Sequence, residues 1–367
     1  MTDLDNQCRS FAAALQLEAY FERAATCARL AILAALMLPD TPSPFGQRRY
    51  NAWNDHVKAR HGGRVQKVSV DAGFTCPNRD GLVGTGGCTF CNNASFTPGY
   101  LSRRQSITEQ IDAGLEFLHR RYPGTPHFIA YFQSYSNTYG EFARLRACYE
   151  EALAHPQISG LAIGTRPDCV PDQVLDYLAE LAGKHIIELE LGVESCNDVA
   201  LARVNRGHDF AASVDAIERA AARGLEVTAH LMLGLPGESH ASMIDGARIL
   251  SALPIRAIKL HQLQLVRGTV LAREWRRDPD SVVLLDEQAC IELLVDFIEH
   301  LSPAILLQRV GSEVPPSQKL APQWNLRLSE LAPRLSAELA RRNSWQGRHY
   351  QRAQVDCNPP PSPTVEV

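Results

Sequence analysis

The stretch Cys76-Pro-Asn-Arg-Asp-Gly-Leu-Val-Gly-Thr-Gly-Gly-Cys88-Thr-Phe-Cys91 places three cysteines within sixteen residues. The last two cysteines form a Cys-x2-Cys pair, and four glycines lie between the first and the second. Because glycine populates positive φ angles, such a loop can fold tightly around a compact object. Three thiolates without a nearby histidine suit a soft metal, either zinc or iron–sulfur. A structural zinc site needs four ligands, whereas a [4Fe–4S] cluster on three cysteines leaves one iron open.

The loop resembles the cluster loop of radical S-adenosylmethionine (SAM) enzymes, whose usual motif is Cys-x3-Cys-x2-Cys. Here the first gap is eleven residues long, and the Cys-x2-Cys half is kept. Widened first gaps also occur in the catalytic subunit of elongator. The resemblance implies that Cys76, Cys88 and Cys91 ligate a [4Fe–4S] cluster whose open iron binds SAM. A zinc knuckle and a trio of reduced surface cysteines are the alternatives.

Composition limits the class of protein. The 367 residues suffice for one large domain or two ordinary ones, and 45% of them are apolar. A net charge of −4 excludes a protein that is basic overall, but not a local basic patch. Ten scattered cysteines with no signal peptide ahead of them predict a reducing, cytoplasmic setting. The longest apolar run, 31–39, is far shorter than the roughly 20 residues of a membrane span, so no membrane partner is expected.

Strand and helix patterns alternate from residue 65 onward. The repeated unit predicts an α/β fold with a parallel sheet and right-handed crossovers. Radical SAM enzymes resemble this plan, which is a partial (β/α)6 barrel open on one side. The cysteine loop follows the first strand, so it should lie at the carboxyl ends of the strands, where such folds gather their chemistry. The expected strands are 65–70, 128–132, 160–164, 186–191, 225–233, 257–263 and 305–310, and the expected helices are 106–121, 141–155, 171–182, 211–223, 239–253 and 286–301.

We expect short extensions on both sides of the barrel. Residues 1–44 form an N-terminal extension, 45–310 the partial barrel, and 311–367 a C-terminal extension with a disordered tail. In the last part, 326–342 is predicted to be a helix broken near Pro333. Elongator carries an acetyltransferase domain after its barrel. Because 311–367 is too short for one, acetyl transfer is not expected here.

Polar motifs at strand ends supply the expected SAM contacts. Relatives often have Gly-Gly-Glu after the second strand; Gln133 and Ser134 stand there and would have to substitute. Glu194 follows the fourth strand, and Arg206 comes twelve residues later, a spacing similar to that in elongator and in oxygen-independent coproporphyrinogen oxidases. The resemblance implies that Glu194 contacts the ribose or methionyl part of SAM, that Arg206 binds its carboxylate, and that His230 makes a further polar contact. Alternatively, Glu194 and Arg206 are polar surface residues, and His230 is a buried strand histidine whose hydrogen bonds are made within the protein.

Three further residues are candidate substrate contacts. Arg166 belongs to a Thr-Arg-Pro-Asp motif after the third strand that elongator shares, and its structural alternative is an ion pair with Asp168. Lys259 and His261 lie on the sixth strand and are expected to face into the barrel.

The resemblance implies an enzyme that cleaves SAM reductively to a 5′-deoxyadenosyl radical, with electrons from a flavodoxin- or ferredoxin-type donor. It points to the elongator-like and coproporphyrinogen-oxidase-like branch and to small bacterial radical SAM proteins. Our preferred substrate is a wobble uridine of tRNA, because of the elongator-like motifs and two basic stretches, 45–72 and 341–352. A solvated charged surface is the alternative explanation of those stretches. Alternative functions are a radical SAM enzyme acting on a small metabolite or a tetrapyrrole, and a non-catalytic iron–sulfur binding or regulatory protein.

Overall fold

The computed structural model describes residues 43–95, 97–102 and 104–351. The chain separates into two units, residues 1–47 and 48–367, and the second unit contains the sheet and its helices. Nearly all of the predicted N-terminal extension and the C-terminal tail lie outside the described residues. Among the described helices, none has the length and low charge that crossing a bilayer requires.

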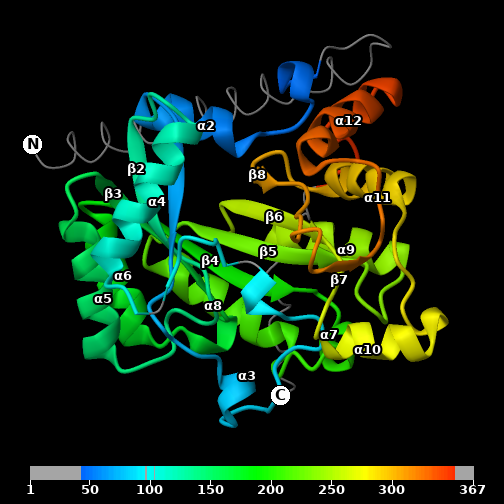
Figure 1. Ribbon diagram of the computed structural model, residues 1–367. Helices are drawn as coiled ribbons and strands as arrows, with labels where there is room; N and C mark the ends of the chain where they lie inside the picture. The colour runs from blue at the N-terminus through cyan, green and yellow to red at the C-terminus, as the bar shows by residue number, and fades with distance from the viewer. Residues whose placement is uncertain (1–42, 96, 103, 352–367) are drawn as a thin grey trace, which may run out of the picture. The chain divides into compact units, whose positions relative to one another are not determined.

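A seven-stranded parallel sheet, curled into a half barrel, forms the centre of the unit (Figure 1). Its strands lie side by side in chain order, and every neighbouring pair is parallel. The predicted α/β partial barrel is therefore confirmed. The strands are β1 (Val65–Val70), β2 (His127–Phe132), β3 (Ile158–Thr165), β4 (Ile186–Glu194), β5 (Val227–Leu233), β6 (Ala257–Gln262) and β8 (Leu306–Arg309).

The crossover helices cover one face of this sheet with apolar side chains. In the first, Ile107, Ile111, Leu115 and Leu118 are buried in a stripe at helical spacing. That helix begins at Ser106, which forms a reciprocal capping box with the third helical residue. The helices are α4 (Ile107–Arg121), α5 (Phe142–Ala154), α6 (Asp172–Ala182), α8 (Phe210–Ala222), α9 (His240–Ala252) and α11 (Glu287–His300).

Several short elements lack the long apolar period that reveals the crossover helices in the sequence. Most of them lie in the loops around the strand ends. They are α2 (Trp53–His61), α3 (Pro77–Asp80), α7 (Asp198–Arg203), α10 (Val270–Arg277), the strands β7 (Leu265–Val266) and β9 (Lys319–Ala321), which pair with each other, and the 3-10 turns η1 (Gly46–Arg48), η2 (Asn93–Ser95), η3 (Pro167–Cys169) and η4 (Pro279–Ser281).

The C-terminal helix α12 (Leu328–Arg341) corrects one expectation, because it runs through Pro333 without a break. Pro333 lies in the second turn, where the missing N–H removes a single helical hydrogen bond. Leu331, Leu335 and Leu339 are buried in the same apolar core as the sheet, and this packing holds the helix together across the proline.

The pairing of β3 with β4 generates a first prediction, on stability. A Cβ atom at Gly160 would overlap the carbonyl oxygen of Ile186, which lies opposite, and would come within 2.7 Å of its carbonyl carbon. We expect Gly160→Ala to lower the free energy of unfolding by about 1–3 kcal/mol, because the strand backbones must move apart. Gly99→Ala is the matched control, since a Cβ atom there meets nothing within 4 Å. Urea unfolding that showed equal stability for the two variants would contradict this view of the sheet.

Candidate functional site

One cavity of about 210 Å³ collects the candidate residues at the carboxyl ends of the strands. Its walls come from the cysteine loop, from the ends and inner faces of β2 to β6, and from β8. All eleven residues singled out in the sequence line it: Cys76, Cys88, Cys91, Gln133, Ser134, Arg166, Glu194, Arg206, His230, Lys259 and His261. Their individual roles remain predictions.

The eleven-residue gap between the first two cysteines folds into a compact loop of its own. Helix α3 starts directly after Cys76 and ends at Asp80, and Gly81 caps it with a left-handed φ of 98°. The amide of Gly87 then donates to the carbonyl of Asn78 at 2.7 Å, which turns the chain back toward Cys88. Because the additional residues bond to one another, the wide gap still leaves all three thiols on the wall of one cavity.

The chemistry of the cysteine loop fits an iron–sulfur cluster. Among the described residues, no three His, Cys, Asp or Glu side chains are arranged to hold one metal ion. A [4Fe–4S] cluster binds each cysteine through a different iron, so its ligands need not meet at a point. Burial raises the pKa of the Cys91 thiol to about 11, and the nearby Cys88 adds to this effect. The positive charge of the irons would stabilise the Cys91 thiolate that a cluster requires.

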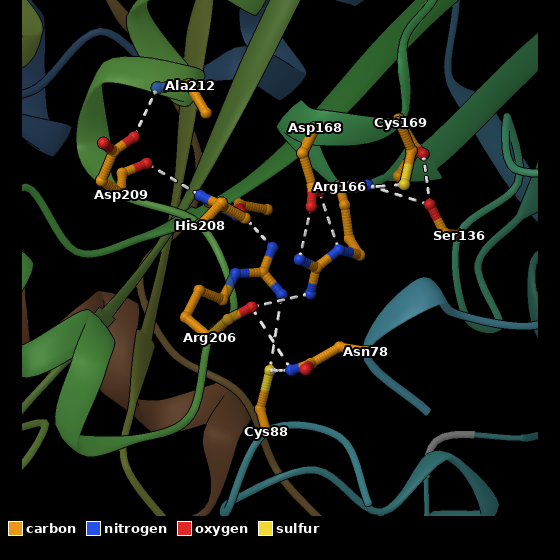
Figure 2. Close-up of polar contacts among 12 residues, drawn as sticks. Asn78, Cys88, Ser136, Arg166, Asp168, Cys169, Arg206, His208, Asp209 and Ala212 are labelled. Carbon is orange, nitrogen blue, oxygen red and sulfur yellow. Dashed lines mark hydrogen bonds and ion pairs between the residues drawn. The ribbon is translucent and has the colours of Figure 1, made fainter. Parts of the chain in front are cut away.

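Arg206 and Glu194 lie beside the cysteine loop. The Arg206 Nη2 donates to the Gly192 carbonyl at 2.5 Å, and its Nη1 lies 3.6 Å from the Cys88 sulfur (Figure 2). Burial raises the pKa of the Glu194 carboxyl, although Arg206 and Arg166 oppose this. A buried guanidinium and a half-buried carboxyl group thus share the cavity wall next to the cysteines.

Arg166 forms the ion pair that was its structural alternative. Its Nε and Nη2 donate to the two carboxylate oxygens of Asp168 at 2.8 and 2.7 Å (Figure 2). Its Nη1 donates to the main-chain carbonyl of Arg206 at 2.9 Å. Arg166 therefore fixes the position of the Arg206 backbone in addition to lining the cavity.

A carboxylate that sequence analysis missed, Glu190, lies at the centre of the barrel. It is fully buried, and its Oε1 accepts from the Nζ atoms of Lys67 and Lys259, both at 2.5 Å. Its Oε2 accepts from the Tyr131 hydroxyl at 2.6 Å and lies 2.9 Å from the Nε2 of His230. Burial alone would raise the pKa of Glu190, but Lys259, Lys67 and His230 outweigh it and hold the pKa well below its usual value.

This cluster sets the protonation of its neighbours. Burial lowers the pKa of Lys259 to about 7 against the pull of Glu190, and burial likewise lowers the pKa of His230 to about 4. His230 is therefore neutral at pH 7 and donates its Nε2–H to Glu190. The ring of His261 lies 5.5 Å from that of His230, and its Nε2 has no hydrogen-bond partner among the described residues.

A sequence signal for this cluster exists in β4. Its residues Ile-Ile-Glu-Leu-Glu-Leu place Glu188 and Glu190 on one face of an otherwise apolar strand, and that face points into the barrel. Lys67, which we counted in a basic stretch, bridges these two carboxylates at 2.5 Å and is not part of an outer surface.

Several of the remaining cations of the two basic stretches are also paired. Arg48 pairs with Asp55 and Arg60 with Glu226. Arg341 and Arg342 both pair with Glu338, and Arg342 also pairs with Asp296. Arg348 donates to the main-chain carbonyl of Asn343 and lies over the Trp345 ring. Ion pairs thus partly neutralise the two basic stretches, whereas Arg49, Lys58 and Arg64 pair with no carboxylate among the described residues. Arg352 lies outside the described residues.

Comparison with known proteins identifies the family. The pattern of the radical SAM superfamily matches residues 79–248, and that of the radical SAM C-terminal domain matches 255–341. The uncharacterised Bacillus subtilis protein YtqA is 32% identical over 322 residues, which cover 87% of this chain and 99% of YtqA. A tRNA uridine(34) acetyltransferase of Dehalococcoides mccartyi is 26% identical over 159 residues, 42% of this chain and 34% of its own. The fold resembles archaeal Elp3 of Methanocaldococcus infernus, with a TM-score of 0.60 and 19% identity over 77% of this chain and 64% of that one.

The cysteine loop leads to a prediction about iron. We expect Cys76→Ala, Cys88→Ala and Cys91→Ala each to abolish cluster assembly, because each removes one of three thiolate ligands. Cys148→Ala, in α5 outside the cavity, is the control and should retain wild-type iron. Iron and sulfide would be counted after anaerobic reconstitution. Full retention in Cys88→Ala, or loss in Cys148→Ala, would overturn the assignment.

Arg206 leads to a prediction about SAM. In Arg206→Lys the charge stays but the guanidinium fork is lost, which should cost about 1.5–3 kcal/mol, or roughly ten- to a hundredfold in SAM affinity. Titration calorimetry on cluster-loaded protein would measure it, with iron content as the check on folding. Arg203→Lys is the control, because Arg203 lies three residues away and pairs with Glu274. Equal SAM affinity in both variants would rule the role of Arg206 out.

Proposed function

The chain belongs to the radical SAM superfamily of enzymes, and we propose that it cleaves SAM reductively at a [4Fe–4S] cluster on Cys76, Cys88 and Cys91 and thereby modifies a tRNA uridine at the wobble position. The observation that carries the choice of substrate is the similarity to Elongator complex protein 3 and to tRNA uridine(34) acetyltransferases. That similarity spans 42% of this chain and about a third or less of each relative. It therefore supports a shared radical SAM part and not a likeness to the whole of those proteins.

The bound cluster and SAM supply the one-electron chemistry, and the residues of this chain position the reactants. Arg206, beside Cys88, binds the SAM carboxylate, and Glu194 binds the ribose or the methionyl part. Gln133 and Ser134, at the end of β2, contact the SAM amino group. The support for these roles is that all four line the same cavity as the cysteines.

The substrate occupies the part of the cavity next to the Glu190 cluster. Lys259 and His261 of β6 and Arg309 of β8 line that part and offer the uridine polar contacts. Glu190 already accepts from four donors and has no free acceptor, so it acts by holding Lys259 and His230 in place. Enzymes of this family need an external source of electrons, and we propose a flavodoxin- or ferredoxin-type donor.

A deletion strain gives the test of this function. We expect mass spectrometry of its tRNA nucleosides to show the loss of one modified uridine and the accumulation of its precursor. Complementation with the wild-type gene should restore the nucleoside, and complementation with Cys88→Ala should not. Unchanged nucleosides would sink the tRNA substrate. If the purified, cluster-loaded protein also failed to cleave SAM, a non-catalytic iron–sulfur protein would be the better interpretation.

A further inference from the structure

Four arginines on and beside α10 form an exposed basic surface. Residues 267–277 read Arg-Gly-Thr-Val-Leu-Ala-Arg-Glu-Trp-Arg-Arg. Leu271 and Ala272 are buried and anchor the helix, whereas the four arginines are exposed. We call the set Arg267, Arg273, Arg276 and Arg277 the α10 arginine surface.

This surface borders the cavity. The amide of Leu271 donates to the carbonyl of Thr89, between Cys88 and Cys91, at 2.9 Å. The side-chain amide of Asn92 donates to the carbonyl of Arg267, also at 2.9 Å. Val266, one residue before Arg267, lines the cavity itself. In Figure 1, α10 lies with α7 and α3 beyond the carboxyl ends of the strands.

The charges of the α10 arginine surface are not neutralised by the fold. Within the described part of the chain, none of its four arginines forms an ion pair with a carboxylate; Glu274 of the same helix pairs with Arg203 at 2.8 Å. Arg267 and Arg273 donate to the main-chain carbonyls of Ser317 and Gly268. Two acids, Asp278 and Asp280, follow the helix at its far end. Arg341 of α12, in contrast, pairs with Glu338 of its own helix.

We propose that the α10 arginine surface binds the phosphate backbone of tRNA while the target uridine enters the cavity. The inference rests on the proposed function. A base held in the cavity leaves its own and the neighbouring phosphates at the mouth, which is where this surface lies. Exposed guanidinium groups bind phosphates at little desolvation cost and release counterions.

An acidic protein, such as an electron donor, fits the surface less well. Specific protein interfaces usually centre on apolar or aromatic side chains. Among the described residues, none of the large apolar side chains that are exposed lies on α10. On α10 the exposed side chains are all arginines, whereas Glu274 and Trp275 are half-buried. Such a surface matches a polyphosphate, whose contacts position the ligand and carry little sequence information.

Salt-dependent binding of unmodified tRNA transcript to the full, cluster-loaded chain tests this inference. We expect a variant with all four arginines changed to Ala to bind about tenfold or more weakly at physiological salt. Its slope of log affinity against log salt should flatten by a little under one unit for each phosphate that the variant no longer binds. Arg276→Ala with Arg277→Ala, which leaves the hydrogen bonds of Arg267 and Arg273 intact, should change both quantities in the same direction. Iron content and SAM affinity should equal those of the wild type.

The matched control removes the same charge elsewhere, by changing Arg120, Arg146, Arg248 and Arg341 to Ala. Each of these is exposed and pairs with an acid on its own helix. This control should bind tRNA like the wild type.

Two outcomes would overturn this inference but leave the proposed function standing. They are equal tRNA binding by the α10 variant and the wild type, and an equal loss of binding in both quadruple variants. Wild-type protein without salt-dependent tRNA binding would overturn the proposed function as well. Normal tRNA binding with slowed reduction by flavodoxin would reassign the surface to the donor.

Discussion

The buried carboxylate of Glu190 is the constraint around which the barrel is built. An unpaired charge at such a depth costs several kcal/mol, so a buried carboxylate persists only when donors surround it. Lys67 comes from β1, Tyr131 from β2, His230 from β5 and Lys259 from β6, and all four meet Glu190 of β4. These contacts tie five of the seven parallel strands to one point and so oppose any slip in their register. On the outer face of the sheet, under the helices, the contacts are apolar, and apolar contacts do not fix the register of the strands in this way.

The same cluster gives the cavity two chemically different regions. Near the cysteines, the buried guanidinium of Arg206 lies beside a sulfur and shares the cavity wall with Glu194. Around Glu190, Lys67 bridges Glu188 and Glu190, Lys259 bonds to Glu190, and Arg309 lines the wall of the cavity. Because Glu190 is saturated by its donors, the groups there that can still bond to a substrate are donors or neutral rings, such as His261.

The fold was predictable from the sequence, and the charge pairing was not. Seven strands and six crossover helices follow from local periodicity, and the common edge of a parallel sheet brings the polar strand ends together. The partner of a charge is not a local property: Lys67 and Glu188 are 121 residues apart, and Arg60 and Glu226 are 166 apart. For this reason the excess of basic residues in 45–72 indicated a basic surface, although some of these residues form ion pairs in the fold. The arginines of α10 stand beside an acid in the sequence, so the sequence analysis did not single them out as a basic surface.

The wide gap in the cysteine motif is explained by how its loop is anchored. The side-chain amide of Asn78, which is fully buried, donates to the carbonyl of Asn205 at 2.5 Å. The side-chain amide of Asn205 donates in return to the carbonyl of Gly87 at 2.9 Å. The segment that these bonds hold is the one that presents Arg206 to the Cys88 sulfur. The additional residues therefore join the cysteine loop to Arg206, so the two are positioned by one set of hydrogen bonds.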